Sequence, residues 1–384
     1  MPALKIALLG SRGIPAGYGG YETLIEEISV RLLEMGHEVT VYCRSHYTPR
    51  SQREFRGVRL VVLPTLATKH LDTPVHTLLS CLHALFRSAG GRCYDAALVV
   101  NSANAVFLPL LWLARVPAAL HVDGIERRRA KWGRLGRTVY ALSERLACVL
   151  PRALVTDAAV IRDRYRSRYG AGSWLITYGV DPRPADAGIR QRLGLEDRGY
   201  FLYVSRFEPE NNPHRVAEAY RRVGGDLPLV MVGDAPYADR FIAGFRDGAD
   251  PRILFPGAIY GDGYRELLSH ALAYVHATEV GGTHPALVEA MGYGNCVIVN
   301  DAPENREAVA DAGLWFRASE PSTLAALLEQ MRTDPAAARR LGAAASDRAA
   351  RRFSWDAVSR SYAELFQSLA RGDESAKGES ATNS

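Results

Sequence analysis

A short apolar run leads into a glycine-rich turn in Ile6-Ala-Leu-Leu-Gly-Ser-Arg-Gly-Ile-Pro-Ala-Gly-Tyr-Gly-Gly-Tyr-Glu-Thr23. The run up to Gly10 predicts a strand, and residues 22–35 predict a helix because apolar residues recur there with helical spacing. Glycines allow backbone amides to come close to a ligand, and the start of the following helix favours an anion. The stretch therefore predicts a first strand–turn–helix unit whose turn binds a negatively charged group.

The spacing of these glycines excludes two common phosphate-binding motifs. A dinucleotide fingerprint needs G-x-G-x-x-G and an acidic residue after the second strand, whereas here two residues separate Gly10 from Gly13 and Arg44 follows the second strand. The turn also lacks the G-K-[ST] of a P-loop. A tight turn without a ligand remains the alternative.

The same pattern of strand and helix repeats along the chain. Further strands are predicted at 39–43, 60–63, 97–100, 118–122, 153–156, 200–204, 227–232 and 253–255, with a helix at 212–223. An amphipathic helix is predicted by an apolar stripe made of Leu135, Val139, Leu142, Leu146 and Val149. This order predicts an α/β protein with two Rossmann-like, doubly wound parallel-sheet domains that face each other across a cleft.

The predicted domain organisation follows from a break rich in proline and charge after residue 180. We expect an N-terminal domain at 1–180, a linker at 181–198, a C-terminal domain at 199–355 and a C-terminal helix at 356–371. Residues 372–384 are rich in serine, glycine and charge, which predicts a disordered tail.

Composition narrows the class of protein. The chain has 384 residues, of which 47% are hydrophobic and 23% charged, as is usual for a globular protein. It has no apolar run of the ~18 residues that a membrane span requires. Its five cysteines form no C-x-x-C pair, and its N-terminus does not resemble a signal peptide. We expect a cytoplasmic protein, with location at the inner face of the membrane as an open alternative.

Two further segments contain candidate binding residues. In Glu279-Val-Gly-Gly-Thr-His-Pro285, a glycine pair precedes a predicted helix that begins near Pro285, and Glu289 lies one turn into that helix. A diphosphate could bind the free amides there, and the carboxylate could accept hydrogen bonds from a ribose. Arg206 follows a predicted strand and could bind phosphate oxygens. The alternatives are an ordinary helix with an exposed glutamate and a surface arginine.

Together these segments resemble the retaining, nucleotide-sugar-dependent glycosyltransferases with the GT-B fold, over nearly the whole chain. The resemblance is strongest to a rhamnosyltransferase-type subgroup that includes dihydrostreptosyltransferase-like enzymes. It rests on the turn at 10–23 and on His121-Val-Asp-Gly124, Arg129-Ala-Lys-Trp-Gly133, Phe207-Glu-Pro-Glu-Asn-Asn212 and Val280-Gly-Gly-Thr-His-Pro285.

The resemblance implies roles for particular residues. Gly19 and Gly20 are similar to the loop beneath the donor diphosphate, and Arg206 to the arginine that neutralises it. Glu289 is similar to the glutamate that binds the donor ribose, and Ala258 and Ile259 to the segment that contacts the nucleobase. His121 and Asp123 are implied to contact the transferred sugar. Donor contacts are also expected from Asn211, Gly281, Gly282 and Thr283.

Two positions depart from the pattern of the broader group. Eight residues before Glu289 that group has a second acidic residue, where this chain has Gly281, and five residues after Arg206 it has a lysine, where this chain has Asn211. Arg12 and Arg306 are candidates to replace the missing phosphate contact.

The resemblance implies transfer of a 6-deoxy-L-hexosyl residue, of the rhamnosyl or dihydrostreptosyl type, from a dTDP-sugar. No cofactor or metal is expected, since the sequence has no Asp-x-Asp. A sugar-nucleotide 2-epimerase or a non-catalytic nucleotide-sugar-binding module are the alternatives. No nucleic-acid partner is expected.

The acceptor is open between a cyclitol phosphate of aminoglycoside antibiotic biosynthesis and a lipid-linked saccharide of cell-envelope polysaccharide assembly. Residues 123–168 contain twelve basic and five acidic residues. Arg127, Arg128 and Arg129 are therefore candidates to bind an acceptor phosphate, or to contact an anionic membrane.

Overall fold

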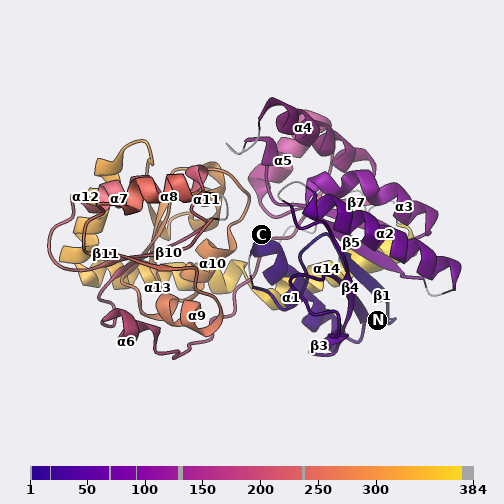
Figure 1. Ribbon diagram of the computed structural model, residues 1–384, viewed down its shortest axis with the longest axis horizontal. Coiled ribbons are helices and arrows are strands. Elements are labelled where there is room, and N and C mark those ends of the chain that lie inside the picture. The colour runs from indigo at the N-terminus through magenta and orange to yellow at the C-terminus, as the bar shows by residue number, and fades with distance from the viewer. Residues whose placement is uncertain are drawn as a thin grey trace. The chain divides into compact units, whose positions relative to one another are not determined.

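The computed structural model describes residues 2–17, 19–68, 71–91, 93–128, 133–235 and 238–373, without the side chains of Arg128 and Leu135. The chain forms two compact units (Figure 1). The N-terminal unit comprises Met1–Tyr178 together with Trp355–Ser384, and the C-terminal unit comprises Gly179–Ser354.

The N-terminal unit is built on an eight-stranded sheet with the order β3-β4-β2-β1-β5-β6-β7-β8. Its strands are β1 (Lys5–Leu9), β2 (Glu38–Arg44), β3 (Glu54–Phe55), β4 (Val58–Leu63), β5 (Ala96–Val100), β6 (Ala118–Val122), β7 (Ala153–Thr156) and β8 (Trp174–Leu175). The short β3 pairs antiparallel with β4, and the other neighbouring strands pair in parallel. Two parallel neighbouring strands must be joined by a long crossover connection, which is usually a helix.

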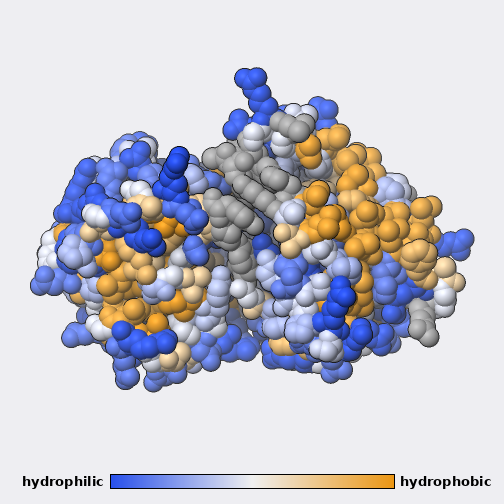
Figure 2. All heavy atoms as spheres, viewed as in Figure 1, coloured by the Kyte–Doolittle hydropathy of each residue, from blue (hydrophilic) through white to orange (hydrophobic). Residues whose placement is uncertain are grey.

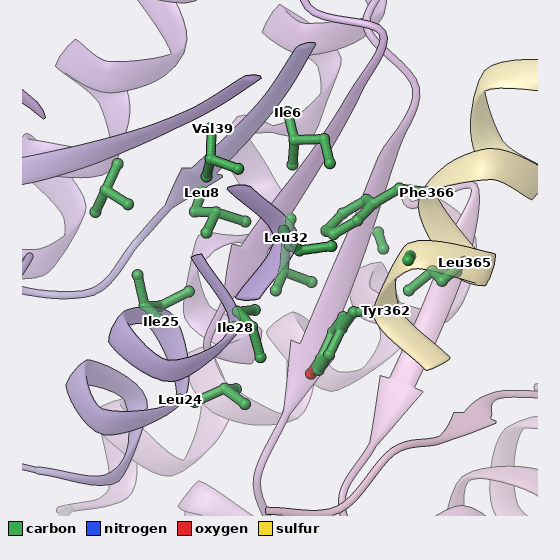
Figure 3. Close-up of a cluster of buried hydrophobic side chains, with 14 of the residues drawn as sticks. Ile6, Leu8, Leu24, Ile25, Ile28, Leu32, Val39, Tyr362, Leu365 and Phe366 are labelled. Atoms are coloured by element: carbon green, nitrogen blue, oxygen red, sulfur yellow. The ribbon is translucent and has the colours of Figure 1, made fainter. Parts of the chain in front are cut away.

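Helices cover both faces of this sheet. They are α1 (Gly20–Glu34), α2 (Asp72–Ala89), η1 (Ser102–Phe107), α3 (Leu108–Leu113), η2 (Glu126–Arg128), α4 (Arg134–Val149), α5 (Ala159–Tyr169) and α14 (Trp355–Arg371). Figure 3 shows side chains of α1 and α14 packed against strand residues such as Ile6 and Val39. A second buried cluster includes residues of α2, α3 and α5. The last helix of the chain thus completes the core of the first unit.

The C-terminal unit has a six-stranded parallel sheet with the order β11-β10-β9-β12-β13-β14. Its strands are β9 (Phe201–Val204), β10 (Leu229–Val232), β11 (Ile253–Gly257), β12 (Ala273–His276), β13 (Cys296–Asn300) and β14 (Gly313–Phe316). Its helices are α6 (Ile189–Leu193), η3 (Pro209–Asn211), α7 (Pro213–Tyr220), α8 (Asp239–Arg246), α9 (Gly261–His270), α10 (Pro285–Gly292), α11 (Pro303–Val309), α12 (Pro321–Thr333) and α13 (Pro335–Arg352).

Two buried clusters enclose this second sheet. One contains residues of α7, α8 and α12, and the other contains residues of α9, α10 and α13. Strands β10, β12 and β13 are completely buried, as expected for the inner strands of a parallel sheet covered on both faces. The predicted class, an α/β protein with two Rossmann-like parallel-sheet domains, is confirmed.

The structure differs from the predicted organisation in two details. Helix α6 lies within residues 181–198, which the sequence indicated as a linker. The carboxylate of Glu266 in α9 fixes this segment, since it accepts hydrogen bonds from the backbone N–H groups of Ala187 and Ile189 at 2.8 and 3.0 Å. Helix α14 packs on the N-terminal unit rather than standing apart.

Candidate active site

In the C-terminal unit, the loops after β9 and β12 meet at one edge of the sheet. All strands are parallel, so their carboxyl ends share this edge, and β9 and β12 are neighbours. Asn212 links the two loops, because its Nδ2 donates to the carbonyl oxygen of Ala277 and to Oε1 of Glu279, both at 2.9 Å. The N–H of Glu279 donates to the carbonyl of Glu210 at 3.0 Å. The segments containing Arg206 and Gly281–Thr283 are thereby held together.

Arg206 lies at this edge with 39% of its side chain exposed. Its Nη1 is 3.6 Å from Oε1 of Glu208, which is too long for a strong hydrogen bond. The guanidinium therefore keeps access to solvent and to an anion. Asn211 is buried, and its Nδ2 donates to the carbonyl of Arg206 at 2.7 Å. Asn211 thus fixes the loop that carries Arg206, and its expected donor contact stays a prediction.

Local packing explains why residue 281 is a glycine. A Cβ built there would lie 2.3 Å from Cε1 of His284, so a side chain at 281 and this position of the imidazole exclude each other. The ring of His284 in turn lies 4.7 Å from that of the buried His276. In this chain an imidazole therefore fills the space next to the position where the broader group has an acidic residue.

Helix α10 begins directly after these glycines. Pro285 occupies its first turn, where the missing N–H costs no hydrogen bond. Gly282 and Thr283 are buried before it. Glu289 lies one turn into the helix, and its Oε2 accepts a 2.7 Å hydrogen bond from the hydroxyl of Tyr264 in α9. Burial, and then the charge of Glu289, raises the pKa of Tyr264 well above its usual value, so the phenol stays protonated and keeps donating.

Ala258 and Ile259 follow β11, two strands away from β9. Ala258 is exposed, whereas Ile259 packs against the cluster that includes α9 and α10. Arg306 in α11 forms an ion pair with Asp301 and stacks on the ring of Trp315 at 4.4 Å. Arg306 is therefore already engaged, which makes it a weak substitute for the missing phosphate contact.

In the N-terminal unit the glycine-rich turn lies at the carboxyl edge of β1. Gly10 has φ +95°, and a Cβ there would lie 2.7 Å from the carbonyl oxygen of Val100, so only glycine fits. The N–H of Arg12 donates to Glu22 at 2.9 Å, which folds the turn back onto α1. Gly19 caps α1 in an extended conformation and Gly20 is its first residue. Both glycines lie at a helix N-terminus, as an anion-binding role requires.

His121 is the penultimate residue of β6 and is fully buried. Its Nδ1 is 2.8 Å from the hydroxyl of Tyr362 in α14. Within the described part of the chain, Nε2 of His121 has no hydrogen-bond partner. Burial lowers the pKa of His121 to about 3, so the ring is neutral near pH 7.

The bond to Tyr362 couples the tautomer of His121 to the phenol. Burial raises the pKa of Tyr362 well above its usual value, so the phenol is protonated and can either donate to Nδ1 or accept from an N–H there. When the phenol donates, the proton of the neutral imidazole is on Nε2, which can then donate to a hydroxyl oxygen.

Asp123 follows β6 and is half-buried beside Tyr21 of α1. Burial, followed by the charge of Asp123, raises the pKa of Tyr21 well above its usual value. The ring of Tyr21 packs edge-on against His121 with the centroids 5.5 Å apart. His121 and Asp123, predicted from one short motif, therefore lie in one aromatic environment that also includes Tyr178.

Of the three arginines predicted to bind an acceptor, the structure describes the side chain of one. Nε of Arg127 is 3.2 Å from the buried carboxylate of Glu144 in α4, which also accepts a 2.8 Å hydrogen bond from Tyr169. Arg127 thus balances a buried charge within the unit. Arg129 lies outside the described residues, as does the side chain of Arg128.

Sequence reasoning missed the residues that orient the others. Tyr362 and Tyr264 act on residues far away in sequence and lie in none of the motifs. Asn212 ends the motif at 207–212, but its bond to Ala277 was not predicted. Among the described residues, no group of three or more His, Cys, Asp or Glu side chains is arranged to hold a metal ion. In the same part of the chain, no helix is long and apolar enough to cross a bilayer.

Comparison with known proteins identifies the fold and the class of enzyme. The model for "Glycosyl transferase 4-like domain" matches residues 19–178, and the model for "Glycosyl transferases group 1" matches residues 186–348. Glycogen synthase of Mycobacterium tuberculosis is 26% identical over 404 aligned residues, with 96% of each chain covered.

Two solved structures share the fold. Sucrose-phosphate synthase from Thermosynechococcus elongatus is 17% identical with a TM-score of 0.79, covering 96% of this chain and 99% of that chain. Anabaena HepE, solved in complex with UDP-glucose, is 18% identical with a TM-score of 0.75, covering 94% and 99%. Since glycosyl transferase models match most of both units, this protein is a glycosyltransferase with the GT-B fold.

Proposed function

We propose that this glycosyltransferase moves a 6-deoxy-L-hexosyl residue from a dTDP-sugar to a hydroxyl group of its acceptor. The observation that carries the proposal is the gathering of Arg206, Gly281–Thr283 and Glu289 at one edge of the C-terminal sheet. These groups supply a cation, the start of helix α10 and a carboxylate in one place.

The charge changes of the reaction fit these groups. When the bond to the anomeric carbon breaks, positive charge develops on the sugar and negative charge grows on the departing diphosphate. Arg206 and the N-terminus of α10 stabilise that negative charge without a metal ion. With retention of configuration, the departing phosphate is the group that accepts the proton of the acceptor hydroxyl.

Glu289 binds the two ribose hydroxyls of the donor, and Tyr264 keeps its carboxylate in position. His121 donates from Nε2 to a hydroxyl oxygen of the transferred sugar. In the tautomer with the proton on Nε2 it acts as an orienting donor rather than as a base, and its pKa of about 3 keeps the ring neutral. Gly19 and Gly20 are further candidates to bind the diphosphate, since they lie at the N-terminus of α1, where an anion is favoured.

The identity of the donor rests on the resemblance to the rhamnosyltransferase-type subgroup. The relatives of known structure include HepE with UDP-glucose, and also a starch synthase from Arabidopsis thaliana with ADP and acarbose. Members of this fold therefore use different nucleotides. The broader group has an acidic residue at position 281, whereas this chain has a glycine with His284 beside it. This difference supports a different sugar specificity.

We propose a lipid-linked saccharide as the acceptor. The argument from basic arginines for the competing cyclitol phosphate is weakened, because Arg127 is paired with Glu144. Val139, Leu142 and Val149 of α4 are exposed, which favours an acceptor at a membrane surface.

The donor assignment is tested by calorimetry with dTDP, UDP, ADP and GDP in the presence of EDTA. We expect dTDP to bind at least tenfold more tightly than the other three, and EDTA to leave its affinity unchanged. Preference for UDP or ADP would overturn the dTDP assignment, and loss of dTDP binding in EDTA would overturn the metal-free site.

A further inference from the structure

Helix α4 presents three residues of its apolar stripe, Val139, Leu142 and Val149, to solvent. Leu142 is 56% exposed and Val149 75%, and Val139 is exposed as well. The side of the helix that packs on the unit carries Ser143, Glu144 and Ala147. At about 100° per residue, the centres of these two sets lie roughly 130° apart around the helix. An ordinary surface helix has the reverse arrangement, with its apolar stripe against the core.

The exposed stripe belongs to a larger apolar face of the N-terminal unit. Neighbouring elements add exposed apolar side chains, since α4 contacts η1, and η1 contacts both α2 and α3. Phe86 of α2 is 73% exposed and Leu113 of α3 is 70% exposed, and Val106 and Trp112 are exposed beside them. Figure 2 shows a broad hydrophobic area over this side of the unit. Contiguous apolar patches of this kind mark surfaces that bind something.

Basic side chains accompany this face. Arg115, Arg134, Arg137, Arg145 and Arg152 are all exposed on or beside α3 and α4. The described part of the chain forms no ion pair with any of the five. Among the described residues between 71 and 152, only one acidic residue, Asp95, is exposed. On α4, Arg134 and Arg145 flank the stripe, an arrangement typical of helices that lie in a membrane interface.

We propose that the face formed by Phe86, Val106, Trp112, Leu113, Val139, Leu142 and Val149 docks on an anionic lipid surface. Its apolar side chains would enter the boundary between headgroups and acyl chains, while the flanking arginines contact the headgroup phosphates. Charge complementarity favours lipid over a second copy of the chain. In a symmetric dimer this face would meet itself, which brings the arginines of both copies together.

The proposal deepens the proposed function, because a lipid-linked acceptor is reached at a membrane surface. It can nevertheless be tested without any sugar or nucleotide. Failure of lipid binding would leave the donor site untouched, whereas failure of dTDP binding in calorimetry would bear on the proposed function alone.

The test is co-flotation of the purified full chain with vesicles. One set contains phosphatidylglycerol mixed with phosphatidylcholine, and the other contains phosphatidylcholine alone. We expect binding to the anionic vesicles that weakens as salt is raised, and much weaker binding to the neutral ones. Brominated lipids should quench the fluorescence of Trp112, and Trp112→Phe should remove that part of the quenching.

Variants assign the binding to this face. Leu113→Ser/Leu142→Ser/Val149→Ser should lower the partitioning onto vesicles at least tenfold. The control is Met35→Ser, which changes an exposed apolar residue at the end of α1 and should leave partitioning unchanged. Arg115→Gln/Arg145→Gln should weaken binding by about fivefold for each arginine removed. Arg192→Gln/Arg351→Gln, on the C-terminal unit, is the matched charge control. All these side chains are exposed, so folding should be preserved, which circular dichroism checks.

Two results would overturn the proposal. One is equal vesicle binding by the wild type and the Leu113/Leu142/Val149 variant, or no binding by the wild type. The other is a dimer, seen by sedimentation, that the same triple variant dissociates, because that would assign the face to a second copy of the chain.

Discussion

At the scale of single residues, the neutral imidazole of His121 depends on a helix from the far end of the chain. Tyr362→Phe removes the hydrogen bond to Nδ1 while keeping the ring that packs in the core. The proton of His121 can then move to Nδ1, which deprives the sugar of its donor. We expect kcat for transfer to fall about tenfold, the equivalent of one charge-neutral hydrogen bond of ~1.4 kcal/mol.

The control for this change is the affinity for dTDP, which Tyr362→Phe should leave unaltered because the C-terminal unit is untouched. A variant with unchanged kcat, or one that loses dTDP binding and transfer together, would contradict the positioning role of Tyr362.

Glu289 tests the ribose assignment. Glu289→Ala removes two charge-assisted hydrogen bonds worth ~1.5–3 kcal/mol each, so we expect the Kd for dTDP to rise at least tenfold. Tyr264→Phe should have a smaller effect of the same sign, since it frees the carboxylate without removing it. Glu218→Ala, an exposed carboxylate on α7, is the calorimetric control. Equal affinities for dTDP in all three variants would refute the ribose assignment.

At the scale of elements, α4 is held by the buried carboxylate of Glu144 in addition to apolar contacts of Leu146 and Ala147. Arg127→Gln removes the charge that faces Glu144, so we expect the free energy of unfolding to fall by about 1–3 kcal/mol. Arg152→Gln, at an exposed position, should change it by less than about 0.5 kcal/mol. Urea denaturation measures both variants. If Arg127→Gln instead raised the KM for the acceptor and left the stability unchanged, Arg127 would be an acceptor-binding residue.

The elements themselves were largely predictable, because their signals are local. Strands such as β6 and β7 have the bounds predicted, since short apolar runs between turns specify buried parallel strands. The burial of α4 was not predictable. Its stripe has the period of an amphipathic helix. The period alone does not tell whether the stripe packs on the protein core or lies on the surface.

The candidate site was predictable only where glycines, proline and charge lie close in sequence. Gly281, Gly282 and Glu289 belong to one such stretch, and the structure places them around the start of α10. The bonds from Tyr362 to His121 and from Asn212 to Ala277 join residues 241 and 65 positions apart. Such pairs depend on tertiary packing, which a single sequence does not reveal.

At the scale of the whole molecule, buried neutral histidines make stability depend on pH. Burial lowers the pKa of His121 and of His276 to about 3, one in each unit. In the unfolded chain these groups take up protons near pH 6.5. Stability is therefore full above that pH and is lost as pH falls below it, by up to about 1.4 kcal/mol per pH unit for each histidine.

We accordingly expect the urea midpoint to fall steadily when the pH is lowered from 7 to 5, before most carboxylates titrate. His276→Phe, if it folds, should reduce the slope. A midpoint that is constant over this range would contradict the neutral, buried state of these two imidazoles.

The most direct test of the account is a transfer assay followed by mass spectrometry. The purified chain is incubated in EDTA with dTDP-rhamnose, alone and with a lipid-linked saccharide from a bacterial envelope. We predict that dTDP is released in step with an acceptor heavier by one deoxyhexosyl residue, and that Arg206→Ala abolishes both. An epimerised nucleotide sugar without any shift of the acceptor mass, or no release of dTDP with any acceptor, would contradict it.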